Sequence, residues 1–159
     1  MSPFFSGEEI IGMAVKTEET GYAFYQQAGE NASTKKLKDL FGFLAKEELK
    51  HKETFSGLKD VIGEKAQGVP VDWDELSLYI KAMTDSSLFL GGDKNINLAV
   101  KASNEKETVD FAMKFEKDTL LFFYELKDLV KTVNKPVIEK IISEEKEHIK
   151  KLAEMKKAL

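Results

Sequence analysis

The sequence has no cysteine among its 159 residues. This absence excludes disulfide bonds, zinc sites with thiolate ligands, iron held by four thiolates, and catalysis by a cysteine nucleophile. Proline is also scarce, because only Pro3, Pro70 and Pro136 occur, and the long stretches between them can form uninterrupted helices. No apolar run approaches the roughly 20 residues that a membrane-spanning helix needs, so we expect no membrane association.

A strong charge of either sign is missing as well. The net charge is −4, and the lysines are interspersed with glutamates rather than gathered on one face, so we expect no binding to nucleic acid. The N-terminal stretch MSPFFSGEEIIGMAVK has neither the basic region nor the cleavage site of a secretion signal, and we expect a cytoplasmic protein. With 42% hydrophobic and 33% charged residues, residues 1–159 are predicted to form a single globular domain.

Four segments carry apolar residues at the three- and four-residue spacing of an amphipathic helix. A capping box that starts at Ser6 opens the first segment, and Asn104 is a suitable N-cap for the third. Asn134 and Pro136 open the fourth, because proline fits the first turn of a helix. The segments cover roughly residues 6–28, 37–63, 104–129 and 134–152.

The connections between these segments predict how the helices are arranged. Short links join the first helix to the second and the third to the fourth, so each pair should be antiparallel. Residues 64–103 form a long crossover, with short helices expected near 73–83 and 94–102. A crossover of this length allows the second and third helices to run parallel. The sequence therefore predicts an all-α protein built as a four-helix bundle.

Both histidines of the chain occur in the same short pattern. Glu48 precedes His51 by three residues, and Glu145 precedes His148 by three residues. Residues at this spacing lie on one face of a helix, so the members of each pair can bind the same metal ion. In helices so rich in glutamate one such pair could arise by chance, but its presence at both histidines favours a binding site.

The pattern belongs to a longer internal repeat. Glu18 and Glu116 each project from the apolar stripe of their helix, and aromatic residues follow each of them six and seven positions later. Glu116 lies 98 positions after Glu18, and Glu145 lies 97 positions after Glu48. Each half of the chain thus has a glutamate on its first helix and Glu-x-x-His on its second, which indicates the duplication of a helical hairpin.

Burying these side chains together has an energetic consequence. A lone carboxylate withdrawn from water costs several kcal/mol, and four of them also repel one another. Two divalent cations would balance the four charges, and neutral imidazoles would complete the ligand set. Oxygen and imidazole ligands without sulfur suit iron, manganese or zinc. The predicted metal ligands are Glu18, Glu48, His51, Glu116, Glu145 and His148.

This pattern resembles the ligand set of the ferritin-like di-iron carboxylate proteins. Within that group, the stretches EETGYAFYQQAGENAS and LFGFLAKEELKHKETFSGL look most like the rubrerythrin family, and the resemblance covers essentially the whole chain apart from the crossover. It implies that Glu48 and Glu145 bridge two iron ions and that each histidine binds one of them. It also implies that Glu18 and Glu116 are the terminal ligands. Tyr25 resembles a tyrosine that donates a hydrogen bond to a ligand carboxylate in the outer shell.

The resemblance also implies a function, the reduction of hydrogen peroxide or dioxygen by a di-iron oxidoreductase. Rubrerythrins normally carry an additional iron–cysteine domain that supplies electrons, and the lack of cysteine here implies an external, rubredoxin-like donor. Thr119 stands where rubrerythrins have an extra glutamate, and Phe123 stands at the position that matches Tyr25. We expect the protein to be a homodimer.

Two other functions are open from the sequence. The chain could sequester or carry iron, with oxidation of that iron as a side activity, or the metals could serve only to stabilise a structural bundle. Glu47 and Glu144 directly precede the two predicted bridging residues. Such flanking glutamates fit either surface positions or contacts to a histidine.

Overall fold

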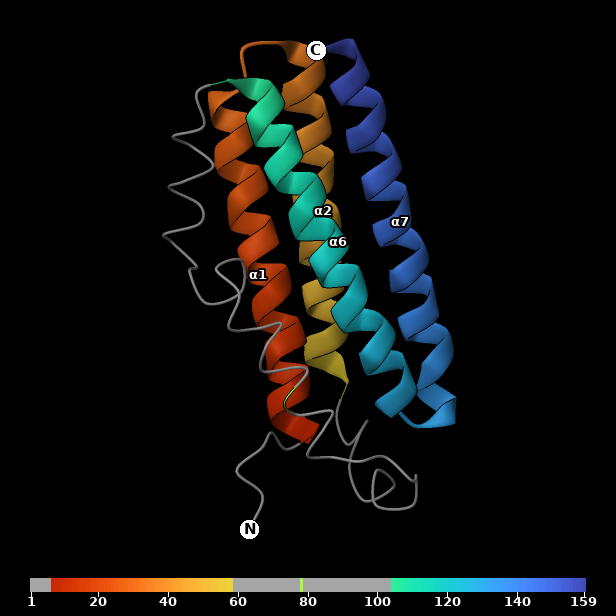
Figure 1. The fold of residues 1–159 in the computed structure, drawn as a ribbon. Coiled ribbons are helices and arrows are strands. Elements are labelled where there is room, and N and C mark those ends of the chain that lie inside the picture. Colours follow the sequence, from red (N-terminus) through yellow and green to blue (C-terminus); the bar gives the residue numbers. More distant parts are fainter. Residues whose placement is uncertain (1–6, 59–77, 79–103) are drawn as a thin grey trace.

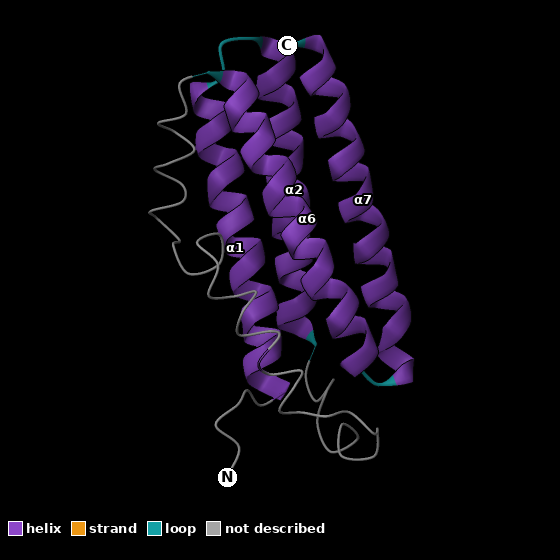
Figure 2. Cartoon of the chain, in the orientation of Figure 1, coloured by secondary structure: helices purple, strands orange, loops and turns teal. Residues whose placement is uncertain are grey.

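The computed structural model describes residues 7–58, 78 and 104–159. Four long helices make up nearly all of this part of the chain (Figures 1 and 2). They are α1 (Gly7–Asn31), α2 (Lys35–Gly57), α6 (Glu105–Leu129) and α7 (Lys135–Ala158), and a short 3-10 helix, η2 (Thr132–Asn134), precedes α7. No strand occurs in the described residues, and the all-α four-helix bundle predicted from the sequence is confirmed.

The order of the helices in space follows the predicted pairing. α1 and α2 run antiparallel and pack against each other, as do α6 and α7, while α2 and α6 run parallel (Figure 1). Since α2 ends and α6 begins at opposite ends of the bundle, the connection between them has to be long. The predicted crossover, residues 64–103, and the short helices expected near 73–83 and 94–102 lie outside the described residues except for Leu78.

The predicted helix starts agree with the capping contacts. The side chain of Asn104 accepts a hydrogen bond from the backbone N–H of Glu107 at 2.9 Å, and Thr34 caps α2 in the same way through the N–H of Leu37. Each cap provides a partner for a backbone N–H that has none inside the helix. Pro136 lies in the first turn of α7, where a missing N–H breaks no helical hydrogen bond.

One predicted boundary is wrong. The apolar spacing predicts a second helix that continues to about Gly63, but α2 ends at Gly57. Leu58 leaves the helix with an extended backbone, φ −83° and ψ 111°, and its N–H bonds to the carbonyl of Phe55. Glycine is a weak helix former, so the helix can end before the apolar pattern does. The remainder of that predicted segment, like Ser6 at the start of the first, lies outside the described residues.

The core consists of two apolar clusters at different heights of the bundle. One includes Ile10 and Phe123, and the other includes Phe41 and Leu152, and all four side chains are almost fully buried. Along each of the four helices, residues of the two clusters lie on either side of a buried polar layer. The apolar clusters therefore separate this layer from water at both ends of the bundle.

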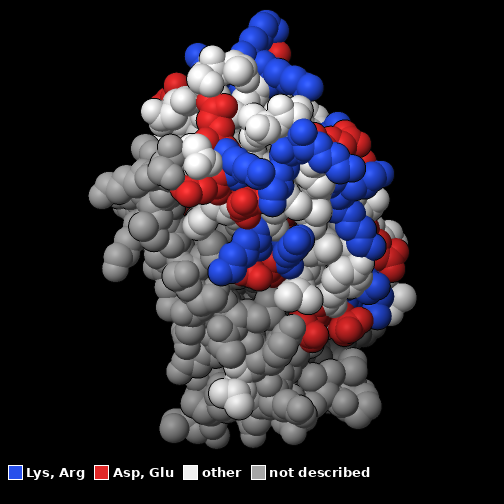
Figure 3. Space-filling model, turned by 45° about the horizontal axis from the view of Figure 1, so that its top comes forward, with Lys and Arg blue, Asp and Glu red and all other residues white. Residues whose placement is uncertain are grey.

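The outer faces of the helices are charged. Lysine and acidic side chains lie next to one another on the face shown in Figure 3. Some form ion pairs between helices, such as Lys156 with Asp110 and Lys52 with Glu19. Exposed pairs of this kind contribute about 1 kcal/mol or less each. Among the described helices, none is long and apolar enough to cross a membrane.

Candidate metal centre

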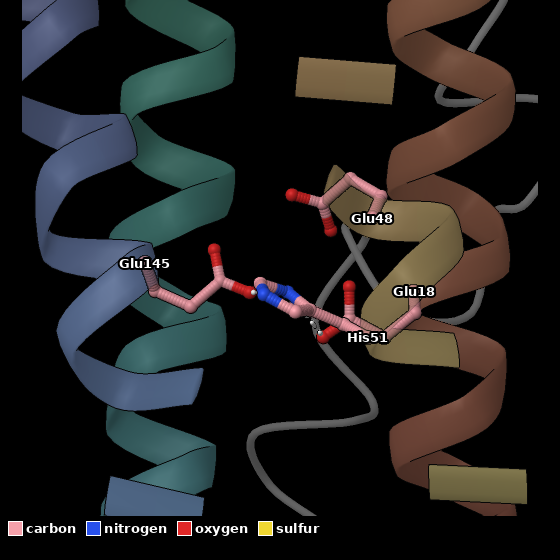
Figure 4. Close-up of side chains that lie close together, drawn as sticks. All are labelled: Glu18, Glu48, His51 and Glu145. Atoms are coloured by element: carbon pink, nitrogen blue, oxygen red, sulfur yellow. Dashed lines mark hydrogen bonds and ion pairs between the residues drawn. The ribbon is translucent and has the colours of Figure 1, made fainter. Parts of the chain in front are cut away.

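The six predicted ligands meet in the polar layer between the two apolar clusters. All four glutamates are fully buried, and the two histidines are 1–2% exposed. Figure 4 shows the side chains from α1 and α2 extending toward Glu145 on α7. The structure thus gathers in one cluster every residue that the repeat singles out, namely Glu18 from α1, Glu48 and His51 from α2, Glu116 from α6, and Glu145 and His148 from α7.

The cluster divides into two overlapping groups with ligand atoms within 4.8 Å of one another. The first group is Glu18, Glu48, His51 and Glu145, and the second is Glu48, Glu116, Glu145 and His148. Glu48 and Glu145 belong to both. Two neighbouring ions that share a pair of bridging carboxylates would need this arrangement. The geometry is therefore compatible with bridging by Glu48 and Glu145, which stays a prediction.

Both histidines direct Nδ1 toward the carboxylates. His51 Nδ1 lies 2.9 Å from Glu145 Oε1, and His148 Nδ1 lies 2.8 Å from Glu145 Oε2. His148 Nδ1 is also 3.2 Å from Glu48 Oε1 and 3.5 Å from Glu116 Oε1. The two imidazole rings are stacked, with centroids 5.7 Å apart. Glu145 therefore contacts both rings at once, with one oxygen for each.

Most polar atoms of the cluster have no hydrogen-bond partner. In the described part of the chain, all but one of the buried side-chain atoms without such a partner belong to the six residues. They include both oxygens of Glu18, Oε2 of Glu48 and Nε2 of His148. A buried polar group left unpaired costs about 1–3 kcal/mol. Metal ions would use these atoms as ligands, and carboxylate oxygen with imidazole nitrogen is a donor set that iron binds.

Burial also changes the proton affinity of the cluster. Burial raises the pKa of Glu18, Glu48 and Glu116 well above the usual value, and the charge of Glu145 raises it further. For Glu145 itself, burial acts in the same direction, but hydrogen bonds with the two histidines outweigh burial and lower the pKa. Burial lowers the pKa of His51, but its hydrogen bond and charge interaction with Glu145 prevail and raise it to about 9. Without metal, protons therefore compensate the buried charges.

Neighbouring side chains hold the cluster in place. The hydroxyl of Tyr25 donates a hydrogen bond to Glu116 Oε1, so the structure contains the contact that the family resemblance implies. Glu144 Oε2 lies 2.9 Å from His51 Nε2. Of the two alternatives for the flanking glutamates, a surface position or a contact to a histidine, Glu144 thus shows the second. Glu47 instead forms an ion pair at the surface. A carboxylate on the outer nitrogen fixes the orientation of the His51 ring and keeps Nδ1 facing the cluster.

The role of Gly21 was not apparent from the sequence. It lies on α1 one turn after Glu18, and a Cβ atom there would be 2.9 Å from Glu48 Oε2 and 3.2 Å from Cε1 of Phe115. Any side chain at this position would require the Glu48 carboxylate to shift from its place in the cluster. A glycine inside a helix lowers the stability of the helix by about 1 kcal/mol relative to alanine, so its presence there needs a reason. A helical glycine three residues after a predicted ligand is therefore the signal in the sequence that could have indicated this role.

Replacing Gly21 with alanine is expected to displace the Glu48 carboxylate and to weaken metal binding about tenfold or more. Gly12→Ala on the same helix is the matched control, since nothing lies within 4 Å of a Cβ at Gly12. The control should gain about 0.5–1 kcal/mol of stability and keep its metal affinity. Titration of both metal-free variants with Fe²⁺ measures the difference, and equal affinities would contradict the expected displacement.

Comparisons with known proteins agree with this geometry. The sequence model of the rubrerythrin family matches residues 9–87. The chain is also similar, with 30% sequence identity and a TM-score of 0.70, to a Thermotoga maritima protein of known crystal structure at 2.30 Å resolution that was assigned as a ferritin-like diiron-carboxylate protein. The match covers 99% of this chain and 98% of that chain. A search of curated proteins found no match.

A four-helix bundle with one glutamate from each of two helices and Glu-x-x-His from each of the other two defines a class of di-metal carboxylate proteins. The similarity over the whole length and the arrangement of the buried residues place this chain in that class. The chain belongs to the ferritin-like di-iron carboxylate proteins, and within them it is rubrerythrin-like.

Proposed function

We propose that this protein is a di-iron oxidoreductase that reduces hydrogen peroxide or dioxygen with electrons from an external donor. The observation that carries the proposal is the convergence of six buried ligand-type side chains from four helices, in two groups that share Glu48 and Glu145. Because buried polar groups in proteins normally have hydrogen-bond partners, the missing partners here favour metal binding over a purely structural polar network. Iron is the first choice of metal, with manganese or zinc as alternatives.

A bound pair of iron ions would supply electrons and Lewis acidity for the reduction of an oxygen–oxygen bond. The protein's own contribution is to position the ligands and to exclude water. The two apolar clusters shield the polar layer on both sides along the bundle. Glu144 keeps Nδ1 of His51 directed inward, and the hydroxyl of Tyr25 holds the carboxylate of Glu116. These contacts fix the ligand positions before any substrate arrives.

We further propose that the electron donor is a separate, rubredoxin-like protein, because the chain has no cysteine with which to hold an iron–thiolate centre of its own. The working form is proposed to be a cytoplasmic homodimer. Sedimentation analysis of the metal-loaded protein tests the oligomeric state, and stopped-flow mixing with reduced rubredoxin tests the donor.

A second candidate function, iron sequestration with ferroxidase activity, is favoured by a group at the edge of the cluster. Ligand atoms of Glu47, His51 and Glu144 lie within 4.8 Å of one another, and both glutamates are partly exposed. This group borders the buried layer on its solvent side, where an entering ion would first meet carboxylates. Uptake of many iron atoms per chain would support this second function.

Elemental analysis of protein purified without added metal tests the metal centre. We expect about two iron atoms per chain. Glu48→Ala and His148→Ala should lose most of this metal, whereas Glu147→Ala should keep it, because Glu147 is exposed and pairs with Lys150. A wild-type protein without stoichiometric metal would overturn the proposal. Peroxide-dependent oxidation of reduced rubredoxin, followed by absorbance, then separates a reductase from a storage protein.

A further inference from the structure

The side chain of Thr119 is a buried polar group that none of the contacts above involves. Thr119 lies in the middle of α6, its exposed fraction is 0%, and its hydroxyl has no hydrogen-bond partner among the described residues. It is the one such atom that does not belong to the six residues of the metal centre. An unpaired buried hydroxyl is unfavourable, so its presence in the core calls for a physical reason.

Other helical threonines of the protein satisfy their hydroxyls locally. Thr17, Thr20, Thr54 and Thr108 each donate to the backbone carbonyl four residues earlier, at 2.8, 2.9, 3.0 and 3.3 Å. This is the usual hydrogen bond of threonine inside a helix. Thr119 does not make the equivalent bond. Its hydroxyl therefore remains available for a group that is not part of the chain.

The placement of Thr119 indicates where such a group would lie. Thr119 follows Glu116 by three residues, so both side chains occupy the same face of α6, and both are fully buried. In the first half of the repeat, Gly21 follows Glu18 by the same three residues. A Cβ at Gly21 would lie 2.9 Å from Oε2 of Glu48. Because the two halves match at this position, we infer that the Thr119 side chain faces the same cluster of carboxylates.

We propose that the hydroxyl of Thr119 donates a hydrogen bond to a small oxygen ligand, of the size of water or hydrogen peroxide, that shares the pocket with the metal ions. This inference rests on the proposed di-metal function and names a residue that binds its ligand. Gly21 and Thr119 occupy matching positions of the repeat, and here the two halves differ. Gly21 leaves space for a carboxylate, whereas Thr119 offers a hydrogen-bond donor. A hydroxyl without a protein partner can serve a ligand without breaking any existing contact.

The first experiment uses the metal-free protein and needs no activity. Thr119→Val removes only the unpaired hydroxyl and keeps the shape of the side chain, so its melting temperature should rise by about 3 °C. Thr17→Val is the matched control, because Thr17 is buried in α1 and its hydroxyl has a partner in the carbonyl of Met13 at 2.8 Å. The control should melt at the wild-type temperature or below. A destabilised Thr119→Val would show that the hydroxyl is structural and would overturn the inference.

The second experiment titrates the oxidised, iron-loaded protein with azide, a small anion that accepts hydrogen bonds, and follows its absorption band on ferric iron. Thr119→Val should bind azide about tenfold more weakly than the wild type, and Thr119→Ser should restore most of the affinity. Metal content is measured on the same samples. Equal azide affinities at full metal content would overturn this inference alone, whereas a wild type without metal would overturn the proposed function with it.

Discussion

Removal of the metal is expected to lower the melting temperature of this protein by about 15–30 °C. An ion bound at a free concentration a thousandfold above its Kd adds about 4 kcal/mol, so two ions add about 8 kcal/mol. The reason lies in the buried layer, where Glu18, Glu48 and His148 have atoms without hydrogen-bond partners. Calorimetry at about pH 7.5, before chelation, after chelation and after iron is restored, measures the change.

The control for this prediction is a variant that has lost a predicted ligand. His148→Ala should melt at nearly the same temperature with and without chelator, because it has little bound metal to lose. A wild type that is equally insensitive to chelation would show that the ions do not stabilise the bundle. Such a result would exclude the structural role and leave redox chemistry or iron transport as the reason for the cluster.

The residues that converge in the buried Glu/His cluster could be predicted because helical geometry is regular. Residues three apart share a face, so Glu48 with His51 and Glu145 with His148 each form a local pair in any helix. The internal repeat then indicates Glu18 as a further ligand. Glu18 precedes the pair on the second helix at nearly the same distance as Glu116 precedes the pair on the fourth. These inferences need only the spacing along one helix and the lengths of the connections.

Contacts between helices could not be predicted in the same way. Tyr25 donates to Glu116 across 91 positions of sequence, and Glu145 contacts the imidazoles of two different helices. Apolar spacing indicates which face of a helix is buried, but not its rotation or height relative to its neighbours. The space that Gly21 leaves and the unpaired hydroxyl of Thr119 depend on those quantities, so only the three-dimensional structure shows them, although the sequence had already marked Thr119 as a departure from the family pattern.

The metal-free protein is expected to lose stability as the pH rises from about 5 to about 9, which is the opposite of acid denaturation. Glu18, Glu48 and Glu116 have pKa values raised well above 4.5 in the folded state, mainly by burial. Above pH 4.5 the unfolded chain releases protons that the folded chain keeps. The stability that these groups contribute is therefore complete below that pH and decreases as the pH rises through their folded pKa values.

His51 acts in the same direction at higher pH. Its pKa is 6.5 in the unfolded reference and about 9 in the folded protein, because contacts with Glu145 outweigh the effect of burial. Its contribution is complete below pH 6.5 and is lost as the pH rises through 9. Glu145 has the opposite sign, since its pKa is lowered. The stability it contributes is lost only under more acidic conditions, so it does not offset the decrease in this range.

Melting curves of the chelated protein across this pH range test the prediction, because each proton retained by the folded state alone changes stability by about 1.4 kcal/mol per pH unit. Glu116→Gln removes one of the proton-binding groups and should make the decrease less steep. The iron-loaded protein should become more stable relative to the chelated one as the pH rises, since metal binding requires deprotonated ligands. A chelated protein whose melting temperature stays constant or rises would show that the carboxylates remain ionised, and the polar layer would then have to admit water when no metal is bound.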